Sequence, residues 1–429
     1  YSPYNIIHNT EKKFRSFFNA KNYKLKIIEL ENQISNIPNL VGYIPTYLDE
    51  SKEIIINNKK FTIKKFDLPL LQISKNRFYN TKGNFYLDYH NNNLFIASGN
   101  GNFAYIGIDK FKNDEGKLIL IKSNLKNLIL YDDFYINSHF GIRDILISDE
   151  KIYVSYNNNV KKNCFNTSIL VADLNLKYLD FKKFFIPKDF VCKSYHEFNP
   201  HSSGGKIINF KENQLLFAHG EYLLRKEAQN LDSLLGKIFS INKSDKSINI
   251  LSQGHRNVQG LAYDKNIIYS TEHGPKGGDE INLNNLNDKD IKNFGWPISS
   301  YGEHYEEKNI TNRLTKYLRY PFKKSHSDYG FTEPLKYFVP SIGISELIIL
   351  NNNFFKSKYK QLLVSSLGSM DKKGESLYFF EIENKKIINE SRISINNRIR
   401  DMIYIDKLNM IVLSLETRND YSKIAIISQ

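Results

Sequence analysis

Residues 254–282 read GHRNVQGLAYDKNIIYSTEHGPKGGDEIN, in which two polar, glycine-rich clusters flank a short apolar run. The apolar run extends from Leu261 to Ser270 and contains a turn at its centre. An ordinary core does not require so many Gly, His, Arg and Asn residues around one hairpin. The stretch therefore predicts a β-hairpin that carries a rigid polar site at one end.

The same hairpin pattern recurs along the chain from about residue 80 onward. Six pairs of β-like runs, each joined by a turn, occupy 85–98, 142–155, 205–218, 258–270, 344–365 and 399–414. Most pairs are followed by a third apolar run, at 168–172, 236–241, 280–283, 377–382 and 423–427. The triplet Ile-Arg-Asp stands at the same place in two pairs, at 142–144 and 399–401, which indicates true repetition. A β-sandwich also contains many short strands, but it does not repeat one hairpin pattern. We therefore predict an all-β fold, a six-bladed β-propeller, over residues 76–429.

Residues 1–75 are less regular than the rest of the chain. They begin with a charged segment, 11–23, for which we expect a helix. Two arrangements fit this lead-in: a small separate segment, or an outer strand added to the propeller.

The bulk composition limits the function classes that fit. Of 429 residues, 41% are hydrophobic, which is enough for a sizeable core, and the formal net charge is +14. Such a charge is typical of proteins that bind nucleic acid or a membrane surface. However, Lys, Asn and Ile are abundant throughout and no Lys/Arg block is dense, so we do not expect nucleic-acid binding. No apolar run approaches about 18 residues, so we expect no transmembrane segment in this chain. The chain begins without Met, and we expect a periplasmic or otherwise exported protein; a membrane anchor in a missing N-terminal segment stays open as an alternative.

The chain has two cysteines, Cys164 and Cys192. They are either two buried thiols or a disulfide, and export favours the disulfide.

Unusual polar residues lie at two positions of the hairpins. At or before the start of a first run stand His139, His201, Arg256, Asn257, Arg398 and Arg400, and just after a second run stand Glu221, His273, Gly274 and Pro275. The start of the first strand and the end of the second lie at the same end of an antiparallel hairpin. If the first strands line the central channel of a propeller, we expect all these residues to meet around one channel mouth.

The residue types at this mouth suggest an anion site. Arginine presents a planar donor fork suited to carboxylates or phosphates, although each arginine taken singly fits a salt bridge equally well. Gly274 and Pro275 are either a simple turn or a source of backbone carbonyl ligands for Ca²⁺. His201 is either a structural histidine or a general base. Glu221 either orients that base or is a solvated surface carboxylate.

At these residues the chain resembles the soluble PQQ-dependent sugar dehydrogenases, the glucose/sorbosone dehydrogenase family. The motifs that carry the resemblance are GHRNVQG at 254–260, EHGPKGGDEIN at 272–282, FGWP at 294–297 and NRIRD at 397–401. The resemblance extends from about residue 135 to the C-terminus.

The resemblance implies a six-bladed propeller that oxidises an aldose sugar or related alcohol and passes electrons to an external acceptor. It implies PQQ in the channel mouth and His201 as the base that takes the sugar hydroxyl proton. The residues similar to cofactor contacts are Arg256, Asn257, His273, Arg398 and Arg400. Gly274 and Pro275 are similar to the backbone ligands of a Ca²⁺ ion that polarises the quinone.

Three departures from the family leave alternatives open. The family lysine after the fifth pair is replaced by Gly368-Ser369, with Lys372 and Lys373 a few residues later. His139 stands where a glutamine commonly lines the sugar site, and the HSSGGK motif around His201 differs locally. One alternative is a propeller that has lost turnover and binds a ligand or protein partner. Another is a metal-dependent hydrolase, which would need Asp, Glu or Asn side chains at a mouth where the sequence places mainly cations.

Overall fold

The computed structural model describes residues 43–57, 59–68, 84–112, 116–137, 139–305, 310–368, 375–417 and 422–429. The chain divides into two compact units, Tyr1–Ile44 and Pro45–Gln429, and nearly all the described residues belong to the second. The helix expected over 11–23, as well as Ser369, Lys372 and Lys373, lie outside the described residues.

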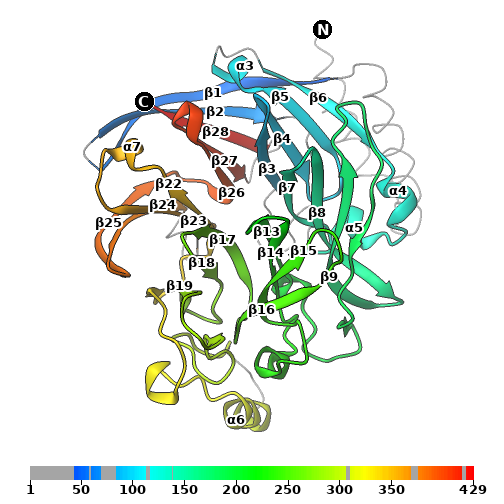
Figure 1. The fold of residues 1–429 in the computed structure, drawn as a ribbon, viewed down its shortest axis with the longest axis vertical. Helices are drawn as coiled ribbons and strands as arrows, with labels where there is room; N and C mark the ends of the chain where they lie inside the picture. Colours follow the sequence, from blue (N-terminus) through cyan, green and yellow to red (C-terminus); the bar gives the residue numbers. More distant parts are fainter. Residues whose placement is uncertain are drawn as a thin grey trace, which may run out of the picture. The chain divides into compact units, whose positions relative to one another are not determined.

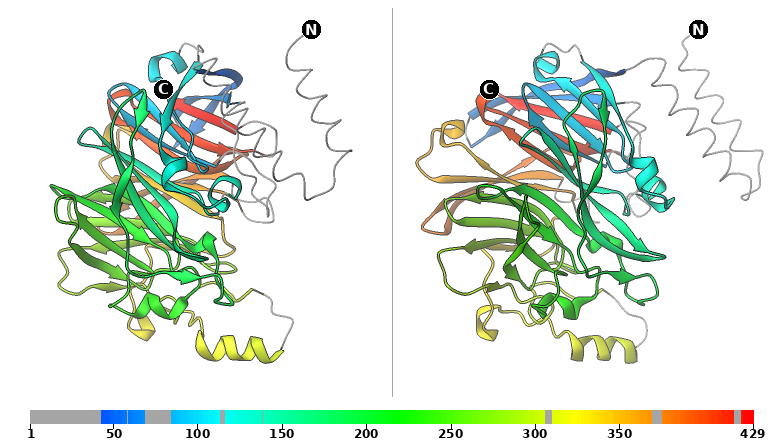
Figure 2. Two further views of the ribbon diagram at one scale, coloured as in Figure 1. Left: turned by 90° about the vertical axis from the view of Figure 1, so that its right-hand side faces the viewer. Right: turned by 45° about the vertical axis from the view of Figure 1, so that its right-hand side comes forward.

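The second unit consists mainly of β-sheets, so the all-β prediction is confirmed (Figures 1 and 2). A ten-stranded sheet contains β26 (Arg398–Ile405), β27 (Met410–Glu416), β28 (Ser422–Ser428), β2 (Lys59–Leu68), β1 (Tyr43–Ile56), β6 (Gly116–Ser123), β5 (Phe103–Gly107), β4 (Asn93–Ser98) and β3 (Phe85–His90), in that order, with β10 (Tyr178–Leu179) paired to β6. A second sheet contains β11 (Lys182–Phe185), β9 (Cys164–Asp173), β8 (Lys151–Lys161) and β7 (Ile142–Ser148), with β12 (Val191–Cys192) paired to β9.

Three further sheets follow along the chain. The third sheet contains β13 (Gly204–Asn209), β14 (Gln214–His219), β15 (Lys237–Asn242), β16 (Ile248–Gln253) and β20 (Lys292–Asn293). The fourth contains β17 (Val258–Asp264), β18 (Ile267–Glu272), β19 (Asp279–Asn285) and β21 (Lys336–Phe338). The fifth contains β22 (Ile344–Leu350), β23 (Lys360–Ser366), β24 (Ser376–Glu383) and β25 (Lys386–Ser394). Short helices lie in the connections: α3 (Ile108–Lys112), α4 (Leu125–Leu128), α5 (Asp133–Ile136), α6 (Ile310–Arg319), α7 (Asn352–Phe355), and the 3₁₀ turns η1 (Pro200–Ser202), η2 (Arg225–Gln229), η3 (Ser327–Tyr329) and η4 (Asp406–Leu408).

The first strands of the hairpins form a closed ring. Strands β3, β7, β13, β17, β22 and β26 contact one another in chain order, and β26 contacts β3 (Figure 1). Side chains that begin these strands therefore face a shared centre although they are far apart in sequence.

Tight turns and bulges explain why the hairpins adopt this form. In the hairpin from β17 to β18, Asp264 pairs with Ile267, and the two turn residues between them have φ angles of 47° and 64°. Positive φ at both turn residues matches the right-handed twist of the strands. Five of the six inner strands carry a register shift that leaves one residue extra. In β7, β17 and β26 the extra residue is Arg143, Gln259 and Arg400, respectively. Bulges of this kind re-aim side chains next to functional sites.

Polar side chains connect neighbouring inner strands. Asp401 Oδ2 accepts a hydrogen bond from the backbone N of Leu87 at 2.7 Å, and Asp144 Oδ2 accepts one from the backbone N of Ile207 at 2.9 Å. Ser414 Oγ donates to the carbonyl of Phe85 at 2.7 Å. These bonds satisfy buried backbone groups between strands that are not paired with each other in a ladder.

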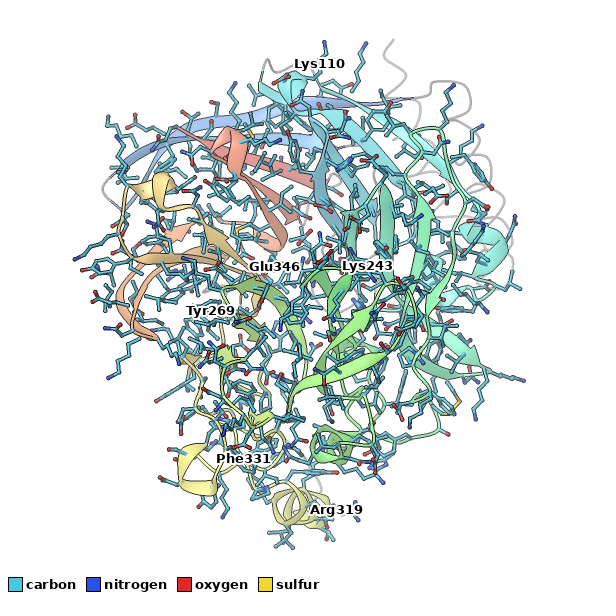
Figure 3. All side chains as sticks on the ribbon, viewed as in Figure 1. Lys110, Lys243, Tyr269, Arg319, Phe331 and Glu346 are labelled. Atoms are coloured by element: carbon cyan, nitrogen blue, oxygen red, sulfur yellow. A yellow bond between two sulfur atoms is a disulfide. The ribbon has the colours of Figure 1, made fainter. Side chains whose placement is uncertain are left out.

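The hydrophobic core consists of apolar layers between adjacent sheets. Tyr269, labelled in Figure 3, packs with Ile344, Leu347 and Phe380 between the β17–β21 sheet and the β22–β25 sheet. Phe217 and Tyr153 belong to the equivalent layer between the β7–β11 and β13–β16 sheets. Middle strands such as β14 and β27 are buried on both faces and are therefore largely apolar along their length.

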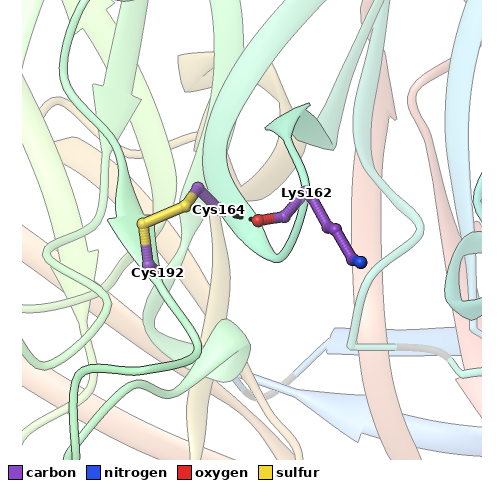
Figure 4. Close-up of a disulfide and its surroundings, with 3 residues drawn as sticks. All are labelled: Lys162, Cys164 and Cys192. Carbon is purple, nitrogen blue, oxygen red and sulfur yellow. Dashed lines mark hydrogen bonds between the residues drawn. A yellow bond between two sulfur atoms is a disulfide. The ribbon is translucent and has the colours of Figure 1, made fainter.

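The two cysteines form a disulfide, as export favoured. Cys164 in β9 and Cys192 in β12 are register partners, and their sulfurs are 2.03 Å apart (Figure 4).

Strands from the two ends of the described chain lie side by side. β2 pairs antiparallel with β28, and β1 neighbours β6. In the described part of the chain, no helix has the length and apolar character required to cross a membrane.

Candidate functional site

His201 lies beside His139 at the entrance to the inner ring. The side chain of Asn199 accepts a hydrogen bond from the backbone N of His201 at 2.9 Å and thereby caps η1, which leads into β13. The ring centroids of His201 and His139 are 3.2 Å apart and the rings are tilted by 42°. The expected base and the expected sugar-site residue are therefore in direct contact.

Both histidines are held in the neutral form. Burial, followed by the positive charges of Arg143 and Arg400, lowers the pKa of His201 to about 3. Burial, His201 and Arg143 lower the pKa of His139 to about 2. A neutral imidazole keeps a lone pair that can accept a proton, which is the state a general base requires.

Arg143 is a site residue that sequence analysis did not select. Its Nη2 donates to the backbone carbonyls of His139 at 2.9 Å and Pro200 at 3.3 Å, and so ties the two histidine segments together. The signal was present in the sequence, because Arg143 occupies the same place in its Ile-Arg-Asp triplet as Arg400 does in the other. Both arginines are the extra residue of a β-bulge.

Arg256 and Asn257 are anchored by backbone contacts from neighbouring segments. Asn257 Oδ1 accepts hydrogen bonds from Gly204 N at 3.0 Å and Gln259 Nε2 at 3.1 Å. Arg256 Nη1 donates to the carbonyl of His273 at 3.0 Å, and its guanidinium lies 5.5 Å from the centroid of Trp296. His273 belongs to the EHGPKGGDEIN motif and Trp296 to the FGWP motif, so three of the motifs quoted above meet at Arg256.

Glu221 lies at the same place but is not exposed. Its exposed fraction is 0%, which rules out the solvated surface carboxylate that sequence analysis left open. Burial raises the pKa of Glu221 to about 7, while the charges of Arg256 and Arg225 oppose that rise. Arg256 thus acts electrostatically on both Glu221 and His201. An orienting role toward His201 stays a prediction.

Arg398 and Arg400 share one buried carboxylate, Glu416. Arg398 Nε and Arg400 Nε donate to its two oxygens at 2.8 Å and 2.7 Å, and Arg398 Nη1 also donates to the carbonyl of Leu367 at 2.8 Å. Burial alone would raise the pKa of Glu416, but the two arginines lower it to about 2. Sequence analysis considered salt bridges for these arginines but missed their partner, Glu416. The signal was its position, because Glu416 ends the second strand of its hairpin, and Glu221 and His273 come just after the second strands of theirs.

The loop after β18 is organised by Asp279. This carboxylate accepts hydrogen bonds from Gly274 N at 3.1 Å, Ile342 N at 3.1 Å and Ile344 N at 2.9 Å. A Cβ atom at Gly274 would lie 2.1 Å from the carbonyl oxygen of Gly278, so the loop tolerates only glycine there and crowds carbonyl oxygens together. Carbonyl oxygens suit Ca²⁺. No group of three or more His, Cys, Asp or Glu side chains suited to a metal occurs among the described residues, so a calcium site here would depend on backbone oxygens.

A second charged cluster lies deeper in the ring. Lys206 Nζ is 3.2 Å from Asp144 Oδ1 and 3.4 Å from Asp401 Oδ1, and it also pairs with Glu346, which Figure 3 places near the centre of the ring. Burial opposes the charge on Lys206, but the three carboxylates hold its pKa well above the ordinary value. These acids therefore surround a cation that the chain itself supplies, and they differ from the open acidic mouth that a metal-dependent hydrolase would need.

The residues of the mouth fit an anionic ligand. A cavity of about 20 Å³ is lined by Arg143 and Arg400 and by the Lys206 cluster, whose three carboxylates make it a place for about one water molecule and not for the anion itself. Within the described residues, the buried Nε atoms of Arg143 and Arg256 have no hydrogen-bond partner. Buried donors of this kind are normally satisfied, which points to an acceptor such as a ligand carboxylate.

Comparisons with known proteins found a family model and several relatives that match this chain. Residues 110–418 match the family model of the glucose/sorbosone dehydrogenases. The chain is 26% identical to aldose sugar dehydrogenase YliI of Escherichia coli over 296 residues, which cover 63% of this chain and 73% of that protein. It is 34% identical to an uncharacterized protein of Synechocystis over 194 residues, which span 42% of each chain and thus less than half of that relative.

Solved structures share the fold. The apo form of the soluble aldose sugar dehydrogenase from Escherichia coli has a TM-score of 0.61 and 21% identity, covering 81% of this chain and 96% of that one. The PQQ-bound form of aldose sugar dehydrogenase from Streptomyces coelicolor has a TM-score of 0.54 and 15% identity, covering 88% and 99%. Because the family model matches most of the chain, the resemblance inferred from the motifs is confirmed: this chain belongs to the glucose/sorbosone dehydrogenase family.

Proposed function

We propose that this protein is a PQQ- and Ca²⁺-dependent dehydrogenase that oxidises an aldose sugar or related alcohol and passes the electrons to an external acceptor. The observation that carries the proposal is the neutral, half-buried His201 in a mouth lined by arginines. Family membership and the PQQ-bound relative support the same reaction class.

We also propose that the fold is a six-bladed propeller over residues 76–429, preceded by a lead-in over residues 1–75. The closed ring of six inner strands supports the blade number. The pairing of β2 with β28 supports a lead-in that completes the last blade from outside.

The cofactor would be held by Arg256, Asn257, His273, Arg398 and Arg400. The bound cofactor would supply the hydride acceptor, and a Ca²⁺ ion held by carbonyl oxygens of Gly274 and Pro275 would supply the Lewis acid that polarises the quinone. The buried, unsatisfied Nε of Arg256 supports an anionic group at this place. The ion pairs of Glu416 keep Arg398 and Arg400 fixed, so that little order has to be gained on binding.

His201 would take the proton of the substrate hydroxyl. The surrounding positive charges disfavour imidazolium, so the ring accepts the proton in the course of the reaction and does not retain it afterwards. His139 touches this ring and would contact the sugar. Glu221 would act on His201 through Arg256, whose charge influences both groups. The disulfide supports an exported, periplasmic location.

Reconstitution tests the proposal. The protein is loaded with PQQ and Ca²⁺, cofactor binding is measured by absorbance, and dye reduction is assayed over a panel of sugars. The proposal expects both binding and turnover, and failure to bind PQQ would refute it. Binding without turnover of any sugar would favour the second candidate, a ligand-binding propeller without activity, which the Gly368-Ser369 replacement of the family lysine motivates.

A further inference from the structure

Helix α6 carries an apolar face that points away from the protein. Leu314 and Leu318 are one helical turn apart and their exposed fractions are 58% and 84%. Tyr317 on the same helix is 42% exposed. Residues at i, i+3 and i+4 share one face, so the three side chains form a continuous exposed stripe. Figure 2 shows α6 projecting from the edge of the second unit.

Contacts of Lys316, and of the Tyr317 ring at the edge of the stripe, fix α6 to the protein, so the two leucines cannot simply turn inward. Lys316 Nζ lies 3.6 Å from Glu197, on the segment that leads to His201. Tyr317 packs edge-on against His304 at 4.6 Å, and His304 stacks on Phe322 at 3.8 Å. Phe322 in turn packs on Trp296 at 5.0 Å, the tryptophan beneath Arg256. A row of rings therefore connects α6 to the rim of the candidate site.

The segment that carries the stripe has side-chain charges of one sign, although two acids from other segments pair with them. Residues 310–324 contain five Lys or Arg residues and no Asp or Glu. Lys316 and Lys324 form ion pairs with Glu197 and Glu303, and Arg319, labelled on α6 in Figure 3, extends the positive charge beyond them. A short helix with exposed leucines and tyrosine beside basic residues has the composition of helices that lie in a membrane interface.

We propose that α6 docks this protein on an anionic lipid surface, with Leu314, Tyr317 and Leu318 entering the headgroup region. The basic segment complements the negative charge of such a surface. A second protein molecule fits less well, because a stable interface buries about 800 Å² on each partner, more than one face of a ten-residue helix offers. Docking through α6 would hold the rim of the candidate site at the membrane.

Vesicle binding tests this proposal without cofactor or turnover, and so independently of the proposed function. The whole protein is sedimented with phosphatidylcholine vesicles, with and without phosphatidylglycerol, over a range of salt concentrations. We expect binding to the anionic vesicles that weakens with salt, and at least about tenfold weaker partitioning for the double variant Leu314→Ser, Leu318→Ser. The matched control is Ile55→Ser, which removes a residue of 63% exposure in β1 and should bind as the unmodified protein does.

A spectroscopic variant gives a second readout. The chain has one tryptophan, Trp296, which is buried, so Leu318→Trp adds a single exposed reporter. Its emission should shift to the blue with anionic vesicles and stay unchanged with neutral ones at the same salt. The proposal is wrong if the unmodified protein ignores anionic vesicles, or if the double variant binds them equally well. A dimer that the double variant abolishes, without vesicle binding, would make this face a self-association surface and would also overturn it.

Discussion

Replacing Glu416 with Gln tests whether one buried carboxylate organises the arginine side of the site. The substitution keeps the size of the side chain and removes its charge. Arg398 and Arg400 would then share a neutral amide in place of a carboxylate. Arg398 would keep its hydrogen bond to the carbonyl of Leu367 but would lose the negative charge beside it. A buried charge that loses its partner is strongly destabilising.

The magnitude follows from the pKa of Glu416. The arginines lower it from an ordinary value of 4.5 to about 2. At about 1.36 kcal/mol for each pKa unit, this difference corresponds to about 3 kcal/mol of folding free energy. Direct loss of a buried ion-pair partner typically costs about 3–5 kcal/mol, which is consistent.

The pH dependence has a defined sign. Because the pKa is lower in the folded than in the unfolded chain, the ionised carboxylate stabilises the fold fully above about pH 4.5. This contribution disappears as the pH falls from about 4.5 to about 2. The difference in unfolding free energy between unmodified protein and variant should therefore be constant at neutral pH and shrink in the acid range.

Urea unfolding followed by circular dichroism at several pH values measures this difference. The matched control is Glu212→Gln, which changes an exposed glutamate in the turn between β13 and β14. We expect the control to lie within about 0.5 kcal/mol of the unmodified protein. A loss below about 1 kcal/mol for Glu416→Gln at pH 7, or a difference that does not shrink in acid, would refute the reasoning.

Four further outcomes are expected. His201→Ala in the reconstituted protein should lower kcat by at least about a hundredfold while PQQ still binds, and unchanged turnover would exclude His201 as the base. Because the pKa of His201 is about 3, kcat/KM of the unmodified enzyme should show no inflection near pH 6.5 from this residue. Asp279→Asn should lower the free energy of unfolding in urea by about 2 kcal/mol or more and should reduce the stabilisation by added Ca²⁺. An unchanged response to Ca²⁺ would mean that this loop does not hold the metal. The double variant Cys164→Ser, Cys192→Ser should lower the free energy of unfolding by about 3–4 kcal/mol, as expected for a cross-link with a sequence separation of 28. A loss near zero would mean that the bond does not constrain the unfolded chain. Lys206→Met should lower the free energy of unfolding by about 3–5 kcal/mol at pH 7. Because the three acids left without their cation can take up protons, part of this loss should be recovered at pH 5. Equal losses at both pH values would contradict the described cluster.

Hairpin positions were predictable because alternating apolar runs and tight turns are local signals. The expected run 258–263 is β17 (Val258–Asp264), and the expected run 344–350 is β22 (Ile344–Leu350). The prediction failed where a strand is polar. The run expected to end at Ser155 continues in β8 to Lys161, because Asn157 is buried and hydrogen-bonded to Tyr222, a partner far along the chain.

The chemistry of the site was predictable only in part. Motif residues such as Arg256 and His273 are close in sequence, and the structure joins them by a hydrogen bond. Arg143 and Glu416 were missed because each resembles an ordinary strand residue. They become part of the site through contacts with His139 and Arg400, which belong to other strands or connections.

By itself, the sequence determined the all-β hairpins and the family, since these depend on local pattern and on residues close together in the chain. Tertiary structure alone decided the protonation states of the site. The pKa of His201 depends on burial and on arginines that arrive from β7 and β26, and the charge of Lys206 depends on three carboxylates from β7, β22 and β26. Electrostatic interactions act through space, and only the closed ring of inner strands brings these groups within reach of one another.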